Sequence, residues 1–326
     1  MDIHDIIVGI YRIEVLLMKM SKKQFEVIRN WMYRNARPLD IARWKYHFEN
    51  GNKDDVLAAL SAYQNPNGGF GYALEADSWN PNSSPIQTWC ATEILYELGI
   101  TDKNNEIVRN ILSYLDSGKD FQDGHWIAQI PTNDDYPHAE WWSYRENVID
   151  QWGYNPTICL VGFILYFADK QSKLYQLALE IAKKATKAFL QDETSEDMHE
   201  ISCFIRYYQY CEKAGLTDIF DADEMINCLR RKVKSSIGED KEGWKDNYMC
   251  KPSQFMITPD SIFYLDNKEL SDYEIDFIIE TMNSDGTWNI TWNWNDYPEQ
   301  WAVSKNWWKA TQTLVNMRYL KNFQCL

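Results

Sequence analysis

Apolar residues along this chain recur mostly at helical spacing. In the segment 105–115, for example, successive apolar residues lie three or four positions apart, which places them on one face of a helix. No stretch alternates apolar and polar residues over six positions beside a tight Asn-Gly turn, so strand signals are nearly absent. The pattern predicts an all-α fold with helices that include Lys22–Asn35, Asp54–Tyr63, Ile86–Leu98, Asn105–Leu115, Thr157–Phe167, Ser172–Phe189, Glu200–Lys213 and Asp223–Ser235.

The predicted helices are of two kinds. Residues 86–98 and 157–167 are apolar around much of the helix circumference, which is typical of helices buried on more than one side. Residues 172–189 instead carry Lys and Glu on one face and apolar residues on the other, which suits an outer position. The two kinds alternate, which predicts two layers, with 86–98, 157–167 and the later segment 306–319 on the inside.

Short glycine turns precede the inner helices. Each has an acidic residue or Asn, then Gly, then an aromatic residue, followed by a loop and a helix start; Gly allows the turn and the aromatic side chain anchors it. The irregular spacing indicates a degenerate repeat. The four copies are Asn67–Phe70, Asp123–Trp126, Glu242–Trp244 and Asp285–Trp288.

The loops that follow two of these turns resemble each other more closely than the other loops do. From Asp123 to Tyr136 is thirteen residues and from Asp285 to Tyr297 is twelve, and in both loops the Tyr lies within an Asp-Tyr-Pro sequence. We interpret them as equivalent positions in a pseudo-symmetric ring. Long repeated loops are more often functional than decorative.

The segment Gln64–Gly71, which reads Gln-Asn-Pro-Asn-Gly-Gly-Phe-Gly, resembles the Gln…Gly-Trp/Phe repeat of the terpenoid cyclase and protein prenyltransferase family, which includes the squalene-cyclase-like repeats. Asp285–Trp288 and Gln300-Trp301 are similar. The segment 69–77, with Trp307-Trp308, looks like a bacterial branch of that family. The resemblance covers residues from about 40 to 323. It implies an α/α-toroid over 37–326, with inner helices ringed by outer ones around a central cavity, and an N-terminal helical extension over 1–36.

The catalytic chemistry of the known family members cannot be assigned to this chain. The Asp-x-Asp-Asp motif with which class II terpene cyclases protonate an alkene is missing, and no His lies near Cys90 or Cys159 to match the zinc ligands of the prenyltransferases. Nucleophile, dinucleotide and phosphate-loop motifs are also missing. The sequence therefore predicts neither a metal nor a cofactor.

Two pairs of carboxylates are the candidate catalytic residues. Glu75 and Asp77 follow a glycine turn and precede an inner helix; a carboxyl group against aromatic walls has a raised pKa and can act as a general acid. Asp135 and Asp296 lie in the two matching loops, where they could flank a substrate as in glycosidic bond cleavage. The alternatives are that Glu75 and Asp77 cap a helix and that the other two begin turns. We expect all four at one end of the ring.

Aromatic residues crowd the same loops and the last helix. Indole faces can stack on sugar rings, or line an apolar pocket and stabilise a cation; the alternative is core packing. Trp alternates with Asn over 291–295, which is more typical of a ligand surface. The candidate substrate-binding residues are Tyr136, Trp141, Trp142, Trp292, Trp294, Tyr297, Trp301 and Trp308.

The net charge limits the kinds of binding partner that the chain can have. Acidic residues outnumber basic ones 48 to 33, a net charge of −15, which disfavours nucleic acid and anionic membrane surfaces. Seven scattered cysteines without a C-x-x-C motif indicate a reduced, cytoplasmic protein. The longest apolar stretch, 157–168, is too short to span a bilayer. Residues 1–20 are expected to form a dispensable amphipathic helix outside the ring.

Three functions remain open for a small-molecule partner. A terpene-cyclase-like or prenyltransferase-like enzyme would need a closed apolar cavity with one buried acid for an isoprenoid. A carbohydrate-active hydrolase or lyase would need an open polar groove with two facing acids and exposed Trp. A non-catalytic toroid that binds a peptide, lipid or glycan would have a filled ring. The sequence does not indicate an oligomeric state.

Overall fold

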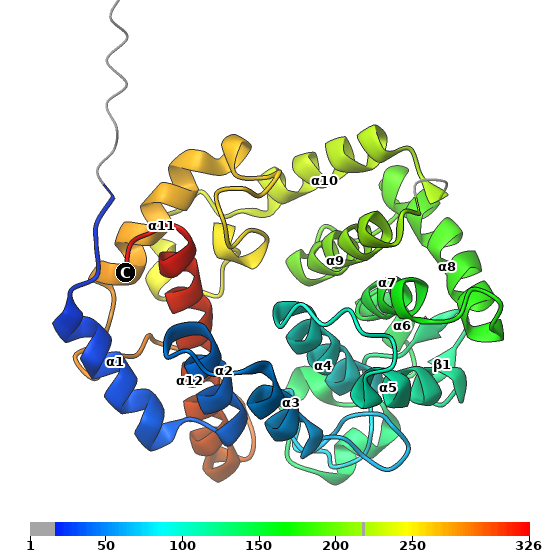
Figure 1. Cartoon of the computed structure of the whole chain (residues 1–326), viewed down its shortest axis with the longest axis horizontal. Coiled ribbons are helices and arrows are strands. Elements are labelled where there is room, and N and C mark those ends of the chain that lie inside the picture. The colour runs from blue at the N-terminus through cyan, green and yellow to red at the C-terminus, as the bar shows by residue number, and fades with distance from the viewer. Residues whose placement is uncertain (1–16, 217–218) are drawn as a thin grey trace, which may run out of the picture.

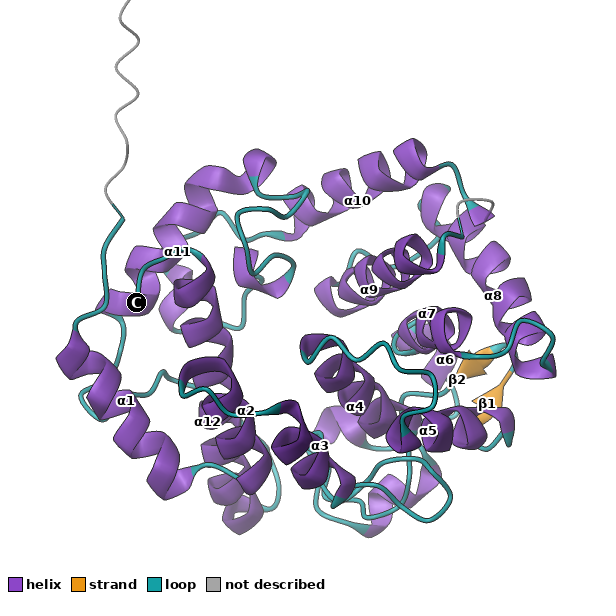
Figure 2. Cartoon of the chain, viewed as in Figure 1, coloured by secondary structure: helices purple, strands orange, loops and turns teal. Residues whose placement is uncertain are grey.

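The computed structural model describes residues 17–216 and 219–326. The prediction of an all-α fold is confirmed: 58% of the chain is helix and 3% is strand (Figure 2). The described residues form one short antiparallel hairpin of β1 (Phe121–Gln122) and β2 (His125–Trp126). They also form α1 (Lys22–Asn35), α2 (Pro38–Phe48), α3 (Lys53–Ser61), α4 (Pro85–Glu97), α5 (Glu106–Asp116), α6 (Val148–Trp152), α7 (Thr157–Phe167), α8 (Lys173–Leu190), α9 (Met198–Ala214), α10 (Ala222–Ser236), α11 (Lys268–Glu280) and α12 (Pro298–Asn322).

Several of the helices begin at residues whose side chains cap them. Ser84 caps α4 and Ser172 caps α8, each accepting a hydrogen bond from a backbone N–H of the first turn, and Ser21 forms a capping box at α1. All eight helices predicted from the sequence are present, with ends that differ by at most two residues. The helix predicted over 1–20 lies almost wholly outside the described residues, and residues 17–20 are not helical.

The two kinds of helix differ in burial as the pattern predicts. Every residue of α7 except Tyr166 is buried, and α7 packs against both α8 and α9. In Figure 1, α1, α11, α10 and α8 lie toward the outside of the molecule, and α12, α4, α7 and α9 lie nearer its middle. A helix that is apolar on all sides needs neighbours on all sides, and the position of α7 provides them.

The first glycine turn closes through two backbone hydrogen bonds. The N–H of Asn65 donates to the carbonyl of Gly69 (2.8 Å), and the N–H of Gly68 donates to the carbonyl of Asn65 (2.9 Å). Gly68 has φ of +90°, and a Cβ at this position would lie 2.0 Å from the carbonyl oxygen of Asn110 in α5. The turn can rest on α5 only because residue 68 lacks a side chain.

The last glycine turn repeats this geometry. The N–H of Asn283 donates to the carbonyl of Thr287 (2.8 Å), and the N–H of Gly286 donates to the carbonyl of Asn283 (2.9 Å). Gly286 has φ of +88°, and a Cβ there would lie 2.8 Å from the backbone of Ile28 in α1. Thus α1 packs on the last turn as α5 packs on the first. The other two copies differ, since 123–126 forms the turn and second strand of the β hairpin and 243–245 forms a 3₁₀ turn.

We expect Gly68→Ala to lower the free energy of unfolding by at least about 3 kcal/mol, because the new Cβ must displace the backbone of α5 and the residue must keep a left-handed conformation. Gly118→Ala is the matched control. Gly118 also has positive φ (+69°), but no atom beyond its chain neighbours lies within 4 Å of the place that a Cβ would take. It should cost only about 1–2 kcal/mol. Urea unfolding followed by circular dichroism measures both, and equal losses would contradict the close packing at Gly68.

Three hydrophobic clusters form the core of the described residues. The largest joins α3–α5 to α7–α10. The second holds Ile28 and Met32 of α1 together with Trp288 and Leu314. The third gathers Ile86, Trp142, Trp294 and Trp301 with neighbours from the loops, and it lies around the acidic residues described below. No described helix has both the length and the apolar character that crossing a bilayer requires.

Candidate functional site

The first turn of α4 shapes the loop that carries Glu75 and Asp77. Gln87 is completely buried, and its side-chain oxygen accepts the N–H of Glu75 (3.0 Å) while its amide nitrogen donates to the carbonyl of Ser78 (3.0 Å). Sequence reasoning missed Gln87. The signal available was an amide side chain in the first turn of a helix that the sequence predicts to be buried.

The backbone just before Glu75 is strained. Tyr72 and Ala73 both have φ of +58°, a left-handed conformation that costs a non-glycine residue roughly 1–3 kcal/mol. The buried Arg37 holds this segment, because its guanidinium donates to the carbonyls of Ala73 (2.8 Å) and Leu74 (3.3 Å). Strain of this kind clusters at functional sites, so it points to this loop.

Asp77 is surrounded by indole donors. Trp294 and Trp308 donate their Nε1–H to Oδ1 of Asp77 (2.8 and 2.6 Å), and Trp292 donates to Oδ2 (3.1 Å). These three residues, here called the tryptophan cage, come from the loop after the last glycine turn and from α12. Asp77 is only 3% exposed. Both of its oxygens are occupied, so Asp77 is held in place and is poorly disposed to transfer a proton to a substrate.

Burial raises the pKa of Asp77 from its ordinary 3.8 to about 6, although the three indole hydrogen bonds favour the charged form. The group is therefore mostly ionised at pH 7. It becomes protonated within a mildly acidic range in which most exposed carboxylates are still charged.

The environment of Glu75 differs from that of Asp77. It is 7% exposed, its Oε2 accepts the N–H of Asp77 (2.9 Å), and Oε1 makes no hydrogen bond with the described residues. Burial raises the pKa of the Glu75 carboxyl well above its ordinary value, and the negative charge of Asp77 raises it further. These effects favour a protonated Glu75 near neutral pH. Of the two acids, Glu75 has the stronger tendency to hold a proton and the oxygen without a hydrogen bond.

The long loop before α6 lies against this acidic loop. The N–H of Ala139 donates to the carbonyl of Asp77 (2.9 Å), and the side chains of the buried Asn80 and Asn133 are hydrogen bonded (2.9 Å). Trp142 stacks on Trp152 at 4.9 Å between ring centroids. Its buried indole N–H makes no hydrogen bond of ordinary geometry with the described residues. It nevertheless lies close enough to Glu75 to favour the charged carboxylate, which opposes the rise in the pKa of that group.

The second pair of predicted carboxylates lies elsewhere. Asp135 and Asp296 are exposed, and their side chains form no hydrogen bond with the described part of the chain. Their two loops nevertheless touch, because the amide of Asn295 donates to the carboxylate of Glu140. The structure therefore buries Glu75 and Asp77 together and leaves the other two acids at the surface.

The predicted aromatic residues mostly face inward. Trp292 and Trp294 point to Asp77, whereas Asn293 and Asn295 are exposed, so the Trp-Asn alternation separates an inner side from an outer side. It does not create an exposed tryptophan platform. Of the other candidates, Trp142 and Trp301 are buried, Tyr136, Trp141 and Trp308 are half-buried, and Tyr297 is exposed.

Tyr248 extends the site beyond the predicted residues. Its ring packs edge-on against Trp292, with 5.4 Å between the ring centroids. Its hydroxyl lies 2.9 Å from Nε2 of His199. Tyr248 is 53% exposed as a residue. Partial desolvation of its hydroxyl raises the pKa of Tyr248, and the nearby carboxylates of Asp197, Asp77 and Glu75 raise it further. No motif marked this residue in the sequence.

The pKa of Asp77 gives a spectroscopic prediction. We expect tryptophan fluorescence to change with a midpoint near pH 6, because the charge on Asp77 changes against three indoles. The transition should be lost in Asp77→Asn and kept in Asp135→Asn. The folded pKa exceeds the ordinary value, so this group's contribution to stability is fully present below about pH 4 and is lost as the pH rises through 6. A midpoint unchanged in Asp77→Asn would contradict the assignment.

The described residues contain no group of three or more His, Cys, Asp or Glu side chains arranged to hold a metal ion. Comparisons with protein-family models, with curated proteins and with solved structures find no match for the chain. The resemblance to the terpenoid cyclases stays a prediction, and the candidate site has to be interpreted from its own geometry.

Proposed function

We propose that this chain is an enzyme in which Glu75 acts as a general acid on an apolar, isoprenoid-like substrate bound beside the tryptophan cage. The observation that carries the proposal is the difference between two neighbouring acids. Asp77 has both oxygens occupied by indole donors, whereas Glu75 is buried, has a raised pKa and keeps one oxygen free.

The proposed reaction begins with transfer of the Glu75 proton to a carbon–carbon double bond. The alkene π electrons form the new C–H bond, the O–H bond breaks, and the adjacent carbon becomes a carbocation while Glu75 becomes a carboxylate. Indole faces stabilise such a cation through the ring quadrupole, and the negative charge of Asp77 adds to this. Loss of a proton from the cation to Glu75 then restores the acid.

The proposal includes an α/α-toroid for the fold. It is supported by the burial of every residue of α7 except Tyr166, by the packing of α7 against α8 and α9, and by the matching turns at Gly68 and Gly286. The sequence resemblance adds to these observations. A cytoplasmic location and a small-molecule partner remain predictions from composition.

The alternative of a glycan-active enzyme with paired carboxylates has less support. Asp135 and Asp296 are exposed loop residues, and the indole N–H groups of Trp292 and Trp294 are turned toward Asp77. A sugar platform would require exposed indole faces.

The test is incubation of the full chain with a panel of linear isoprenoid alkenes and alcohols in D₂O, followed by mass spectrometry of the extract. Protonation of an alkene by Glu75 should give products that contain carbon-bound deuterium. Binding is measured separately by quenching of tryptophan fluorescence. Quenching without deuterated product would indicate a non-catalytic binding protein, and the absence of both would contradict the proposed substrate class.

A further inference from the structure

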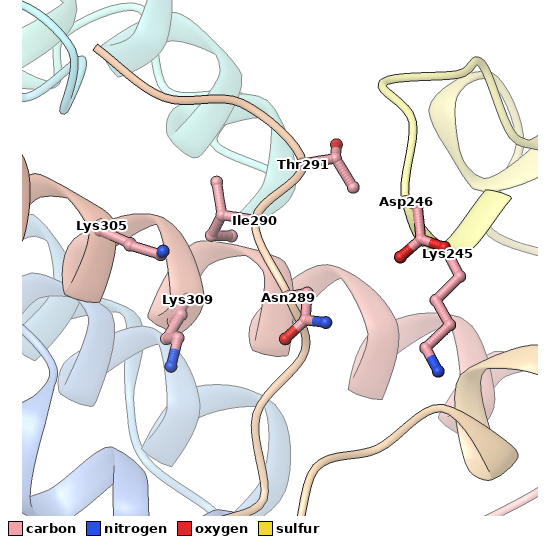
Figure 3. A pocket seen from close by; sticks show the side chains of 7 residues that line it. All are labelled: Lys245, Asp246, Asn289, Ile290, Thr291, Lys305 and Lys309. Carbon is pink, nitrogen blue, oxygen red and sulfur yellow. The ribbon is translucent and has the colours of Figure 1, made fainter. Parts of the chain in front are cut away.

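A small polar hollow of about 220 Å³ lies next to the tryptophan cage (Figure 3). Residues 289–291 directly precede Trp292, and Lys305 and Lys309 lie on either side of Trp308 along α12. With about 30 Å³ per water molecule, the hollow has room for roughly seven waters, which suits a small ligand or a single head group. It is lined by Lys245, Asp246, Asn289, Ile290, Thr291, Lys305 and Lys309.

The lining is cationic although the chain as a whole carries a net charge of −15. Three lysines face one carboxylate, that of Asp246. Lys309 lies 4.0 Å from Asp285, and among the described residues no carboxylate lies within 4.0 Å of the ammonium group of Lys245 or Lys305. Unpaired cations gathered around a concave surface create a local positive potential that attracts anions.

The neutral lining groups also favour an acceptor-rich ligand. The side-chain oxygen of Asn289 accepts a hydrogen bond from Asn283 (3.2 Å), which leaves its NH₂ group as a donor, and the hydroxyl of Thr291 is a further donor. Figure 3 shows Lys305 and Lys309 on one side of segment 289–291 and Lys245 on the other, with the Asn289 amide between them.

We propose that this hollow binds a small multivalent oxyanion, namely a phosphate or diphosphate group. Ammonium, amide and hydroxyl donors match the several oxygens of such a group, and charge-assisted hydrogen bonds are the stronger kind. The ammonium groups of Lys245 and Lys305, which have no carboxylate within 4.0 Å among the described residues, outweigh the one lining carboxylate, and Asp285 already partners Lys309. This proposal does not depend on the role of Glu75, because the hollow and the buried acid involve different side chains.

Isothermal titration of the full chain with inorganic diphosphate, in buffer containing EDTA, tests the proposal. Wild type should bind saturably. The variant Lys245→Ala/Lys305→Ala should bind at least about tenfold more weakly, since it removes the two unpaired cations. The control Lys183→Ala/Lys184→Ala removes the same charge from exposed positions on α8 and should change the dissociation constant less than about twofold.

Asp246→Asn gives a test in the opposite direction. It removes the one repulsive carboxylate and should tighten diphosphate binding, so the proposal can be judged even if the double variant does not fold. No saturable binding to wild type, equal weakening in both double variants, or no tightening in Asp246→Asn would each overturn the proposal.

Discussion

Asp77→Ala should lower the free energy of unfolding by about 3–4 kcal/mol. The substitution leaves three indole N–H donors without their acceptor, and each unsatisfied buried donor costs about 1–3 kcal/mol. The cost should fall short of three full penalties, because Trp292 and Trp308 are only half-buried and can reach water, whereas Trp294 is 3% exposed. Urea unfolding followed by circular dichroism measures the change.

Asp135→Ala is the matched control for this prediction, because it removes an exposed carboxylate from a neighbouring loop and should cost less than about 0.5 kcal/mol. The loss of stability in Asp77→Asn should lie between the losses in Asp77→Ala and Asp135→Ala. Its amide keeps one acceptor oxygen but presents an NH₂ group to the indoles. If Asp77→Ala were no less stable than the control, the tryptophan cage would not hold this residue as described.

Glu75→Gln should lower the rate of deuterium incorporation by about 10²- to 10⁴-fold, the usual contribution of a general acid. Stability should change by less than about 1 kcal/mol, because Gln has the size of a protonated Glu and its oxygen can still accept the N–H of Asp77. Turnover and urea unfolding are measured on the same preparation. A large loss of stability with little loss of turnover would assign Glu75 a structural role.

Asp135→Asn and Asp296→Asn separate the two catalytic hypotheses. Both carboxylates are exposed, so neither substitution should disturb the fold. With Glu75 as the acid, both variants should also keep nearly full turnover. If they lost as much activity as Glu75→Gln with stability intact, the paired-carboxylate alternative from the sequence would be favoured.

The helices could be predicted because their signals are local. The caps at Ser84 and Ser172 and the apolar periodicity lie within each helical segment, so neighbouring residues suffice to locate it. The packing of α1 on the turn at Gly286 could not be predicted, because it brings residue 28 against a turn near the other end of the chain.

Only part of the candidate site could be predicted from the sequence, for the same reason. Glu75 and Asp77 lie in a loop whose position before an inner helix marked them. Their indole partners follow 215 to 231 residues later, and no local pattern pairs them with Asp77. The alternation of Trp and Asn over 291–295 fits either an exposed platform or an inward cage, and only the contact between Trp294 and Asp77 distinguishes the two.

The infrared difference spectrum between wild type and Glu75→Gln at pH 7 tests the central claim most directly. If Glu75 is the buried general acid, the wild type should show the carbonyl stretch of a protonated carboxyl group that is missing from the variant, and Asp135→Asn should leave that band unchanged. A difference spectrum with only carboxylate bands would show that Glu75 is ionised at neutral pH, and would contradict its role as the acid.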